Sequence, residues 1–417
     1  MPGNWPRQLE RRLRGRYVFS AAGPPIPGGV VTFRGRRIVA VGDDRGAAGL
    51  EDLGNVALLP GLVNAHTHLE FSDLDRPLGQ AGIRLDEWIR LLMDRRRSRA
   101  NCHPEGTRRG LEECIRTGTT TLGEIAQPAW PVDAFEAATI QAVVFLELIA
   151  ARAESVAPAL ALAEDHRQVR PSNRWLPGLG PHAPYTVRLE LLDRVVALSA
   201  ARRIPLAFHL AESREELELL ATGTGPMADF LRGLETWDPG VAARATRPLD
   251  YLRRLAAADR VLVVHGNYLD GEEIAFLAQN QARMTVVYCP RTHAFFGHDH
   301  YPLSPMLAAG VPVCLGTDSR ASSPDLSILA EMRAVSRKHP AVDPRIVLEL
   351  ATLCGAKALG LEREMGSLEQ GKCADLAAVA LPDWDSPDPY ELLLDSELPV
   401  VTTWHNGEQV FPRPESR

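Results

Sequence analysis

Lysine is nearly missing from this chain of 417 residues. Only Lys338, Lys357 and Lys372 are present, all late in the sequence, and the other basic residues are arginines. Most of the chain therefore has no lysine that could act as a metal ligand or as a nucleophile.

Paired cysteines and long apolar runs are missing as well. None of the six cysteines forms a CxxC pair, which excludes a zinc ribbon and argues against a disulfide framework. The longest apolar stretch, 140–151, is interrupted by Gln141 and Glu147 and is too short to cross a bilayer. No apolar segment follows the basic N-terminal residues, so we expect no signal peptide and a cytoplasmic protein.

Positive charge is in deficit, with a formal net charge of −7. This balance argues against nucleic acid or an anionic membrane as the main partner and leaves a small molecule as the expected ligand. Hydrophobic residues make up 45% of the chain and charged residues 24%, as in a globular protein with a large core. The length fits two or three domains, or one α/β barrel with a smaller addition.

Short apolar runs alternate with charged, helix-like segments through the middle of the chain. The runs are Leu62–His68, Thr119–Glu124, Val143–Leu148, Pro177–His182, Pro205–His209, Val261–His265, Thr285–Cys289 and Val311–Thr317. The segments 86–99, 189–201 and 271–280 between them have helical patterning. Repeated β-then-α units predict a parallel sheet, and eight of them predict a (β/α)₈ TIM barrel.

Both chain ends have a different, β-rich pattern. The runs 30–33 and 38–41 are separated by Gly35, and 373–380 and 399–404 read as strands followed by an Asn406-Gly407 turn. We therefore predict a small β-sandwich domain from residues 1–60 and 366–417, and a barrel from residues 61–365. The Gly/Pro-punctuated segment 222–250 reads as an insertion after the fifth barrel strand.

Histidines stand at the ends of the predicted strands. They are His66, His68, His182, His209 and His265, and Asp318 follows the eighth strand. Active sites of TIM barrels lie at this rim, so these residues are expected to converge. Side chains at i and i+2 of a strand share a face, so one metal can reach both histidines of the first pair. Three imidazoles and a carboxylate suit Zn²⁺ or Fe²⁺.

Each of these residues also has an ordinary explanation. His66 and His68 could be polar loop residues, His265 a buried structural histidine, and Asp318 a helix N-cap. Glu212, three residues after His209, is either a proton-transfer group above the site or an acid favoured by a helix N-terminus. We do not expect all of these ordinary explanations to hold together, because the residues stand at the ends of successive strands.

Five motifs in order carry a family resemblance: PGLVNAHTHLEFS, GPHAPYT, FHLAES, VVHGNYL and LGTDSRASSPDLS. They resemble the amidohydrolase superfamily, and within it the aminohydrolase/chlorohydrolase branch with its cytosine, guanine and S-adenosylhomocysteine deaminases. GRRIVAVG and GSLEQGKCADLAAVA extend the resemblance to the chain ends. HTHLEFS, the DFLRGLETWDP insertion and CPRTHAFF look closest to the aminodeoxyfutalosine deaminases of menaquinone biosynthesis.

The resemblance implies one divalent metal per chain, with zinc favoured and iron as the alternative. The implied ligands are His66, His68, His209 and Asp318. Glu212, His265 and Asp318 would be the catalytic residues. A carboxylated-lysine dinuclear site is excluded because no lysine lies between the first ligands and the fifth strand, whereas a bridge by Glu124 stays open.

The implied reaction is hydrolytic deamination of an amino-substituted N-heterocycle, with hydroxide attacking the amino-bearing carbon. The residues expected to contact the substrate are His182, Glu70, Trp88, His293 and Ser319. Thr292-His293 replaces a Ser-Asn pair of many relatives, so the exact substrate does not carry over. A substrate carboxylate could bind one of Arg95, Arg291 and Arg320.

Three alternatives are kept. The first is a chlorohydrolase-like enzyme, the second a deaminase of another base or of S-adenosylhomocysteine, and the third an inactive relative that only binds. A homodimer is the assembly considered for such a barrel, although no residue pattern indicates it.

Overall fold

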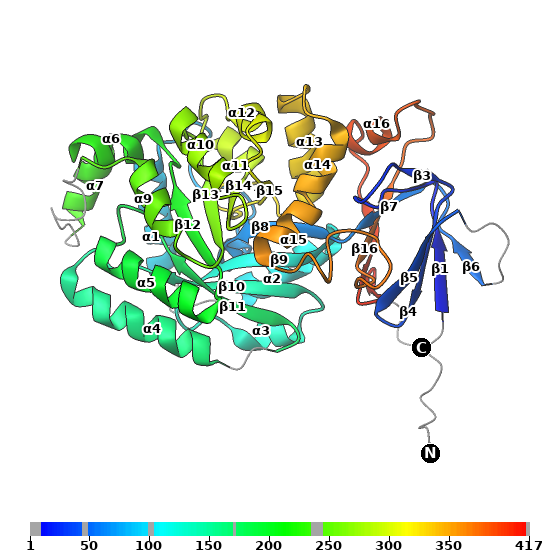
Figure 1. Cartoon of the computed structure of the whole chain (residues 1–417), viewed down its shortest axis with the longest axis horizontal. Coiled ribbons are helices and arrows are strands. Elements are labelled where there is room, and N and C mark those ends of the chain that lie inside the picture. Colours follow the sequence, from blue (N-terminus) through cyan, green and yellow to red (C-terminus); the bar gives the residue numbers. More distant parts are fainter. Residues whose placement is uncertain (1–9, 44–48, 99–103, 170–171, 235–244, 414–417) are drawn as a thin grey trace, which may run out of the picture.

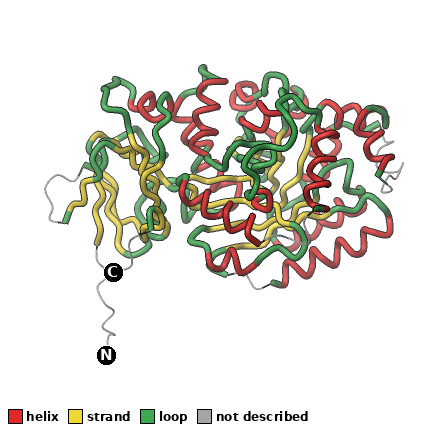
Figure 2. Tube along the Cα trace, turned by 180° about the vertical axis from the view of Figure 1, so that it is seen from behind, coloured by secondary structure: helices red, strands yellow, loops and turns green. Residues whose placement is uncertain are grey.

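Three sheets organise the molecule, an eight-stranded parallel sheet and two smaller sheets beside it (Figure 1). The computed structural model describes residues 10–43, 49–98, 104–169, 172–234 and 245–413. Helices surround the eight-stranded sheet, whereas the two smaller sheets carry few of them (Figure 2).

The eight-stranded sheet follows the chain order. Its strands are β8 (Leu62–Thr67), β9 (Thr119–Ala126), β10 (Gln141–Leu148), β11 (Trp175–Pro181), β12 (Leu206–Leu210), β13 (Val261–His265), β14 (Met284–Tyr288) and β15 (Val313–Leu315). Each strand pairs in parallel with the next, and a bridge between Thr67 and Asp318 brings the last strand back to the first. The predicted barrel is confirmed. Six of its strands are buried at every residue, as expected for a sheet covered by helices.

The helices connect these strands and cover the barrel. They are α1 (Leu85–Arg97), α2 (Pro104–Arg116), α3 (Val132–Ala137), α4 (Val156–Gln168), α5 (Leu189–Arg202), α6 (Arg214–Thr222), α7 (Pro226–Gly233), α9 (Pro248–Leu255), α10 (Gly271–Gln279), α11 (Pro290–Phe295), α12 (Leu303–Ala308), α13 (Ile328–Lys338), α14 (Pro344–Leu350) and α15 (Leu353–Leu359). Short 3₁₀ turns span Leu69–Phe71 and Ala153–Ser155. The N-terminus of α10 is fixed by a capping box, which Asp270 and Glu273 form.

Both chain ends contribute to the smaller sheets. One consists of β5 (Arg37–Gly42), β4 (Val30–Arg34), β1 (Glu10–Arg14) and β6 (Leu50–Asp52). The other consists of β18 (Glu408–Phe411), β17 (Val400–His405), β16 (Leu376–Ala380), β7 (Val56–Pro60), β2 (Tyr17–Val18) and β3 (Ile26–Pro27). A shared core between them contains Leu13, Phe33, Leu58, Leu376 and Trp404. Helix α16 (Pro389–Leu394) follows β16.

The smaller sheets meet the barrel at Gly61. This glycine alone separates β7 from β8, and its N–H donates to the carbonyl of Asp375 (2.8 Å). A side chain here would collide with Thr120 of β9, which favours glycine at the junction. The domain division at 60/61 and 365/366 stays a proposal.

Part of the predicted insertion 222–250 is described and contains α7. Residues 235–244, with most of the LETWDP motif, lie outside the described residues. None of the described helices combines the length and the apolar character needed for a membrane span.

Candidate active site

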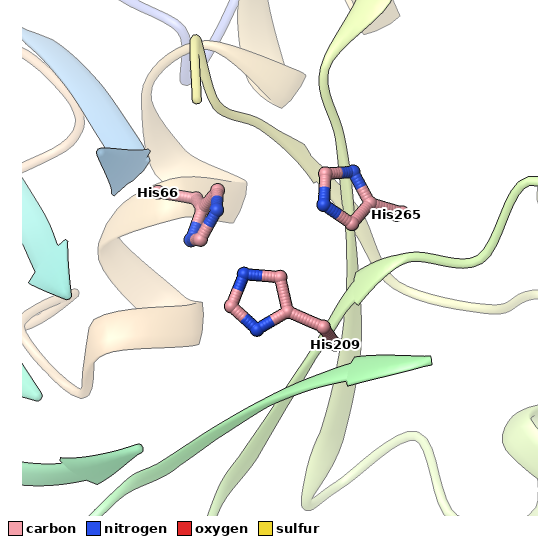
Figure 3. A group of neighbouring side chains, drawn as sticks. All are labelled: His66, His209 and His265. Carbon is pink, nitrogen blue, oxygen red and sulfur yellow. The ribbon is translucent and has the colours of Figure 1, made fainter. Parts of the chain in front are cut away.

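Histidine rings from several barrel strands converge at one end of the barrel. The ring of His66 on β8 lies 4.9 Å from that of His68 and 5.0 Å from that of His209 on β12. The ring of His265, at the end of β13, lies 5.4 Å from that of His209. Figure 3 shows His66, His209 and His265 facing one shared space. The structure thus brings together residues that are up to 199 positions apart in the sequence.

Two overlapping groups of metal-binding atoms occupy this space. His66, His68 and Asp318 form one, and His66, His209 and His265 form the other, with the ligand atoms in each within 4.8 Å of one another. Nε2 of His66 and Nε2 of His68 lie 3.8 and 3.7 Å from Oδ1 of Asp318. Both ring nitrogens of His66 are buried and have no hydrogen-bond partner among the described residues. A metal ion fits this donor set because it would bind Nε2 of His66, one of these two buried nitrogens, together with the neighbouring donors.

A backbone contact orients the histidine from β12. Nδ1 of His209 lies 3.0 Å from the carbonyl oxygen of His182. A carbonyl only accepts, so Nδ1 donates, and Nε2 keeps its lone pair for a metal. Such a contact to the second ring nitrogen is typical of metal-binding histidines.

Burial keeps these imidazoles neutral. It lowers the pKa of His209 to about 3 and, with the neighbouring rings, holds the pKa values of His66, His68 and His265 well below their usual range. Neutral imidazole is the form that binds metals. Burial also raises the pKa of Asp318 to about 7. A divalent cation beside Asp318 would favour its charged form.

The backbone at the strand ends is strained. His265 has a φ of 70° and Asp318 a φ of 57°, in the left-handed region that residues with a Cβ rarely adopt. Such strain concentrates at functional sites, at a cost of roughly 1–3 kcal/mol per residue.

Glu212 lies above the histidines and is buried, with 7% of its surface exposed. Its Oε1 is 3.4 Å from Nε2 of His265. Burial and the nearby Asp318 raise the pKa of Glu212 well above its usual range, which favours the protonated acid. Ser213, not Glu212, caps α6 by accepting from the N–H of Glu216. The helix-terminus explanation of Glu212 is therefore the weaker one.

A cavity of about 700 Å³ opens in front of these groups. Eight of the predicted site residues line it: His68, Trp88, His182, His209, Glu212, His265, Asp318 and Ser319. Nε1 of Trp88 donates to the carbonyl of Ala321 (2.9 Å). The remaining wall is largely apolar and includes Phe71, Leu92, Met93, Tyr185 and Phe230.

Two residues predicted to contact the substrate lie outside the described cavity lining. Glu70 pairs with Arg96 (2.7 Å). His293 is buried against Tyr288, Tyr301 and His298, with ring centroids 5.4 to 5.9 Å away. The motif position predicts that His293 contacts the substrate, but its ring packs against these aromatic residues and not along the cavity.

The three arginines considered for a substrate carboxylate are engaged elsewhere. Arg95 pairs with Asp73, Arg291 with Asp325 and Glu331, and Arg320 with Glu113. None is among the residues that line the described cavity. Sequence reasoning missed the arginines that do line it, which are Arg96, Arg97 and Arg152. Helical spacing was the available signal, because Trp88, Leu92 and Arg96 follow one another at i+4 on α1.

Glu124 has a different role from the bridging one left open above. Its carboxylate lies 2.6 Å from Oγ1 of Thr67 and accepts from the N–H of Leu69 (3.0 Å). It belongs to neither group of metal-binding atoms in the described chain. Glu124 therefore holds the segment that carries His66 and His68.

Comparisons with known proteins agree with this geometry. Residues 57–410 match the Amidohydrolase family. The 5-methylthioadenosine/S-adenosylhomocysteine deaminase of Moorella thermoacetica is 32% identical over 391 residues, which cover 85% of this chain and 83% of that protein. The aminodeoxyfutalosine deaminase of Deinococcus radiodurans is 29% identical over 361 residues, which cover 81% of this chain and 82% of that protein.

Solved structures show the same fold. Helicobacter pylori aminofutalosine deaminase, in complex with methylthio-coformycin, matches with a TM-score of 0.85 at 23% identity, covering 96% of this chain and all of that one. An adenosine deaminase from Xanthomonas campestris with bound zinc matches with a TM-score of 0.80 at 26% identity, covering 97% of this chain and 93% of that one.

Proposed function

Because this chain belongs to the amidohydrolase family, we propose that it is a metal-dependent deaminase that hydrolyses an amino-substituted N-heterocycle and releases ammonia. The observation that carries the proposal is the contact between Glu212 and His265 (3.4 Å) beside the His/Asp cluster. It supports the proposal because a carboxyl group with a raised pKa and an imidazole with a lowered pKa lie next to a site that fits a metal.

We assign the metal to His66, His68, His209 and Asp318, with zinc favoured. When bound, zinc would supply a Lewis acid and lower the pKa of a water molecule towards about 7. His265 remains outside this ligand set, and its Nε2 faces Glu212.

The chain's own residues then move the protons. Asp318 accepts a proton from the attacking water. Glu212 protonates a ring nitrogen next to the amino-bearing carbon, which makes that carbon electrophilic. His265 donates a hydrogen bond to the tetrahedral centre. Asp318 returns its proton to the exocyclic nitrogen and ammonia leaves, while the remaining hydroxyl proton returns to Glu212 as the carbonyl forms.

The proposed substrate is an adenine nucleoside with a substituent at the 5′ position. The apolar walls at Trp88 and Phe230 suit a flat heterocycle, and the volume exceeds what a free base needs. The named relatives act on adenine-bearing compounds, and aminodeoxyfutalosine of menaquinone biosynthesis is the candidate favoured by the motif resemblance. The cytoplasmic location and the homodimer stay predictions.

The test is ammonia release by zinc-loaded protein. The panel contains adenosine, 5′-methylthioadenosine, S-adenosylhomocysteine, aminodeoxyfutalosine, guanine and cytosine, with a chlorotriazine assayed for chloride. We expect turnover of an adenine nucleoside, with a loss of about 10²- to 10⁴-fold in Glu212→Gln. Glu218→Gln, at an exposed position of α6, is the matched control. Chloride release without ammonia, or no reaction with zinc bound, would contradict the proposal.

A further inference from the structure

Glu147 is a buried carboxylate of the cavity that the proposed reaction does not use. It is the penultimate residue of β10 and lines the cavity, with 2% of its side chain exposed. A charge in the interior is costly unless it is paired or has a function.

Among the described residues, one of its two carboxylate oxygens accepts a hydrogen bond. Oε2 accepts from the side-chain amide of Gln127 and lies 3.7 Å from Nη1 of Arg96. Oε1 lies 4.0 Å from Nε2 of His182, beyond hydrogen-bond range, and accepts no hydrogen bond within the described part of the chain. Burial opposes the charge, but the nearby Arg96 outweighs it and holds the pKa of Glu147 below its usual value. Glu147 is therefore an anion with a vacant acceptor.

His182 does not fill that acceptor. Its Nδ1 lies 2.7 Å from Oγ1 of Thr186, and this hydroxyl donates to the carbonyl of Ala183 (3.3 Å). Thr186 therefore occupies Nδ1 of His182, and Nε2 lies 4.0 Å from Oε1 of Glu147 without a hydrogen bond between them. Oε1 of Glu147 thus keeps its acceptor capacity for a donor from a bound molecule.

Arg96 supplies the complementary donor. Its Nη2 contacts Glu70 (2.7 Å), and its guanidinium lies 5.4 Å from the ring centroid of Phe71. These contacts hold Arg96 on the cavity wall beside Glu147. The acceptor Glu147 lies next to the donor Arg96. This combination suits hydroxyl groups, because each hydroxyl both donates and accepts, whereas a ring N–H only donates.

The position of this pair relative to the His/Asp cluster indicates which part of a substrate it meets. The ring of His182 lies 5.0 Å from that of His209, and Nε2 of His182 lies 4.0 Å from Oε1 of Glu147, so His182 neighbours both the cluster and Glu147. A heterocycle that presents its amino-bearing carbon to the cluster extends along His182. Its ring substituent then comes to Glu147 and Arg96.

We propose that Glu147 and Arg96 bind a vicinal pair of hydroxyls on the substrate, as found on ribose, and thereby select nucleosides over free bases. The inference rests on the proposed deaminase function, because it takes the reacting carbon to lie at the cluster. Glu147 is a specificity-determining residue in this assignment.

The test compares a substrate with its analogue that lacks both hydroxyls. Zinc-loaded wild type is assayed with whichever of adenosine and 5′-methylthioadenosine it deaminates faster, and with the 2′,3′-dideoxy form of that nucleoside. We expect the ratio of the two kcat/KM values to favour the hydroxylated substrate and to fall about 10- to 100-fold in Glu147→Gln, as for a lost hydrogen bond to a charged group. Glu154→Gln, at a residue whose side chain is 71% exposed, is the matched control.

The outcomes are distinct. An equal fall for both substrates in Glu147→Gln, with normal folding and zinc content, would mean that Glu147 acts by positioning His182 and would overturn the proposal. Equal use of both substrates by the wild type would overturn it too. If the wild type released no ammonia from any nucleoside, the deaminase function itself would fail.

Discussion

Oε2 of Glu124 lies 2.6 Å from Oγ1 of Thr67, the residue between His66 and His68. The same carboxylate accepts from the N–H of Leu69, so it binds the segment on both sides of His68. Glu124 is itself buried at the end of β9. The strand next to β8 therefore fixes the backbone that carries the two histidines.

We predict that Glu124→Ala weakens zinc binding about 10- to 100-fold, as for other residues that orient metal ligands. The substitution leaves the Thr67 hydroxyl and the Leu69 amide buried without their partner. Zinc affinity is measured by competition with a chromogenic chelator, and Glu112→Ala, exposed on α2, is the control. An unchanged zinc affinity in Glu124→Ala would show that Glu124 does not position the ligands.

We predict that chelation of the metal lowers the melting temperature and that zinc restores it. The nitrogens of His66 are buried without a partner in the described chain, so the metal-free protein carries their desolvation cost. A ligand at 1,000 times its Kd stabilises the folded state by about 4 kcal/mol. Calorimetry with and without chelator measures the shift, and His68→Ala should respond weakly. A wild-type melting temperature that is insensitive to the chelator contradicts a metal held at this site.

We predict that Arg291→Met destabilises the fold by about 3–5 kcal/mol, because it leaves a buried carboxylate uncompensated. Nε of Arg291 lies 2.6 Å from Oε1 of Glu331, whose side chain is fully buried. Arg337→Met, in an exposed pair with Glu397, should cost at most about 1 kcal/mol. Urea denaturation compares the two variants. Equal losses of unfolding free energy in the two variants would mean that burial does not determine how much the Arg291 ion pair contributes to stability.

We predict that stability falls on acidification and that His293 contributes to the fall. Burial lowers the pKa of His293 from 6.5 to about 3, so between these values the unfolded chain binds a proton that the folded chain does not. The stability from this group is full above pH 6.5, is lost as pH falls towards 3, and amounts to about 2 kcal/mol between pH 7 and pH 5.

His293→Phe should therefore flatten the pH dependence by about that amount. Urea denaturation at pH 7 and pH 5 measures it, with His300→Gln at an exposed histidine as the control. An unchanged slope in His293→Phe would place the acid sensitivity in other residues.

The sequence predicted the barrel because each strand is a short apolar run followed by a helix-like segment. The strands of the terminal sheets were harder to predict. The sequence of β1 is ERRLR, whose Arg/Leu pattern is not typical of a strand, and its strand conformation depends on pairing with β4. The histidines at strand ends identified the candidate site. Glu147 was missed because, within an apolar run, it read as an interruption and not as a group facing a cavity. Which arginine of α1 faces the cavity depends on the packing of the helix against the barrel.

The residues assigned to the metal lie in or just after the first, fifth and eighth strands of the barrel. On the ribosome, His66 and His68 emerge early, and Asp318 is made only when most of the chain is complete. The Thr67–Asp318 bridge cannot form before residue 318 is made, since it needs both ends of the barrel. The nascent chain therefore passes through a long period in which two exposed histidines could capture metal without the enclosing site. The complete ligand set and the closed barrel therefore become available together, and a ribosome stalled before residue 318 would carry an incomplete set of ligands.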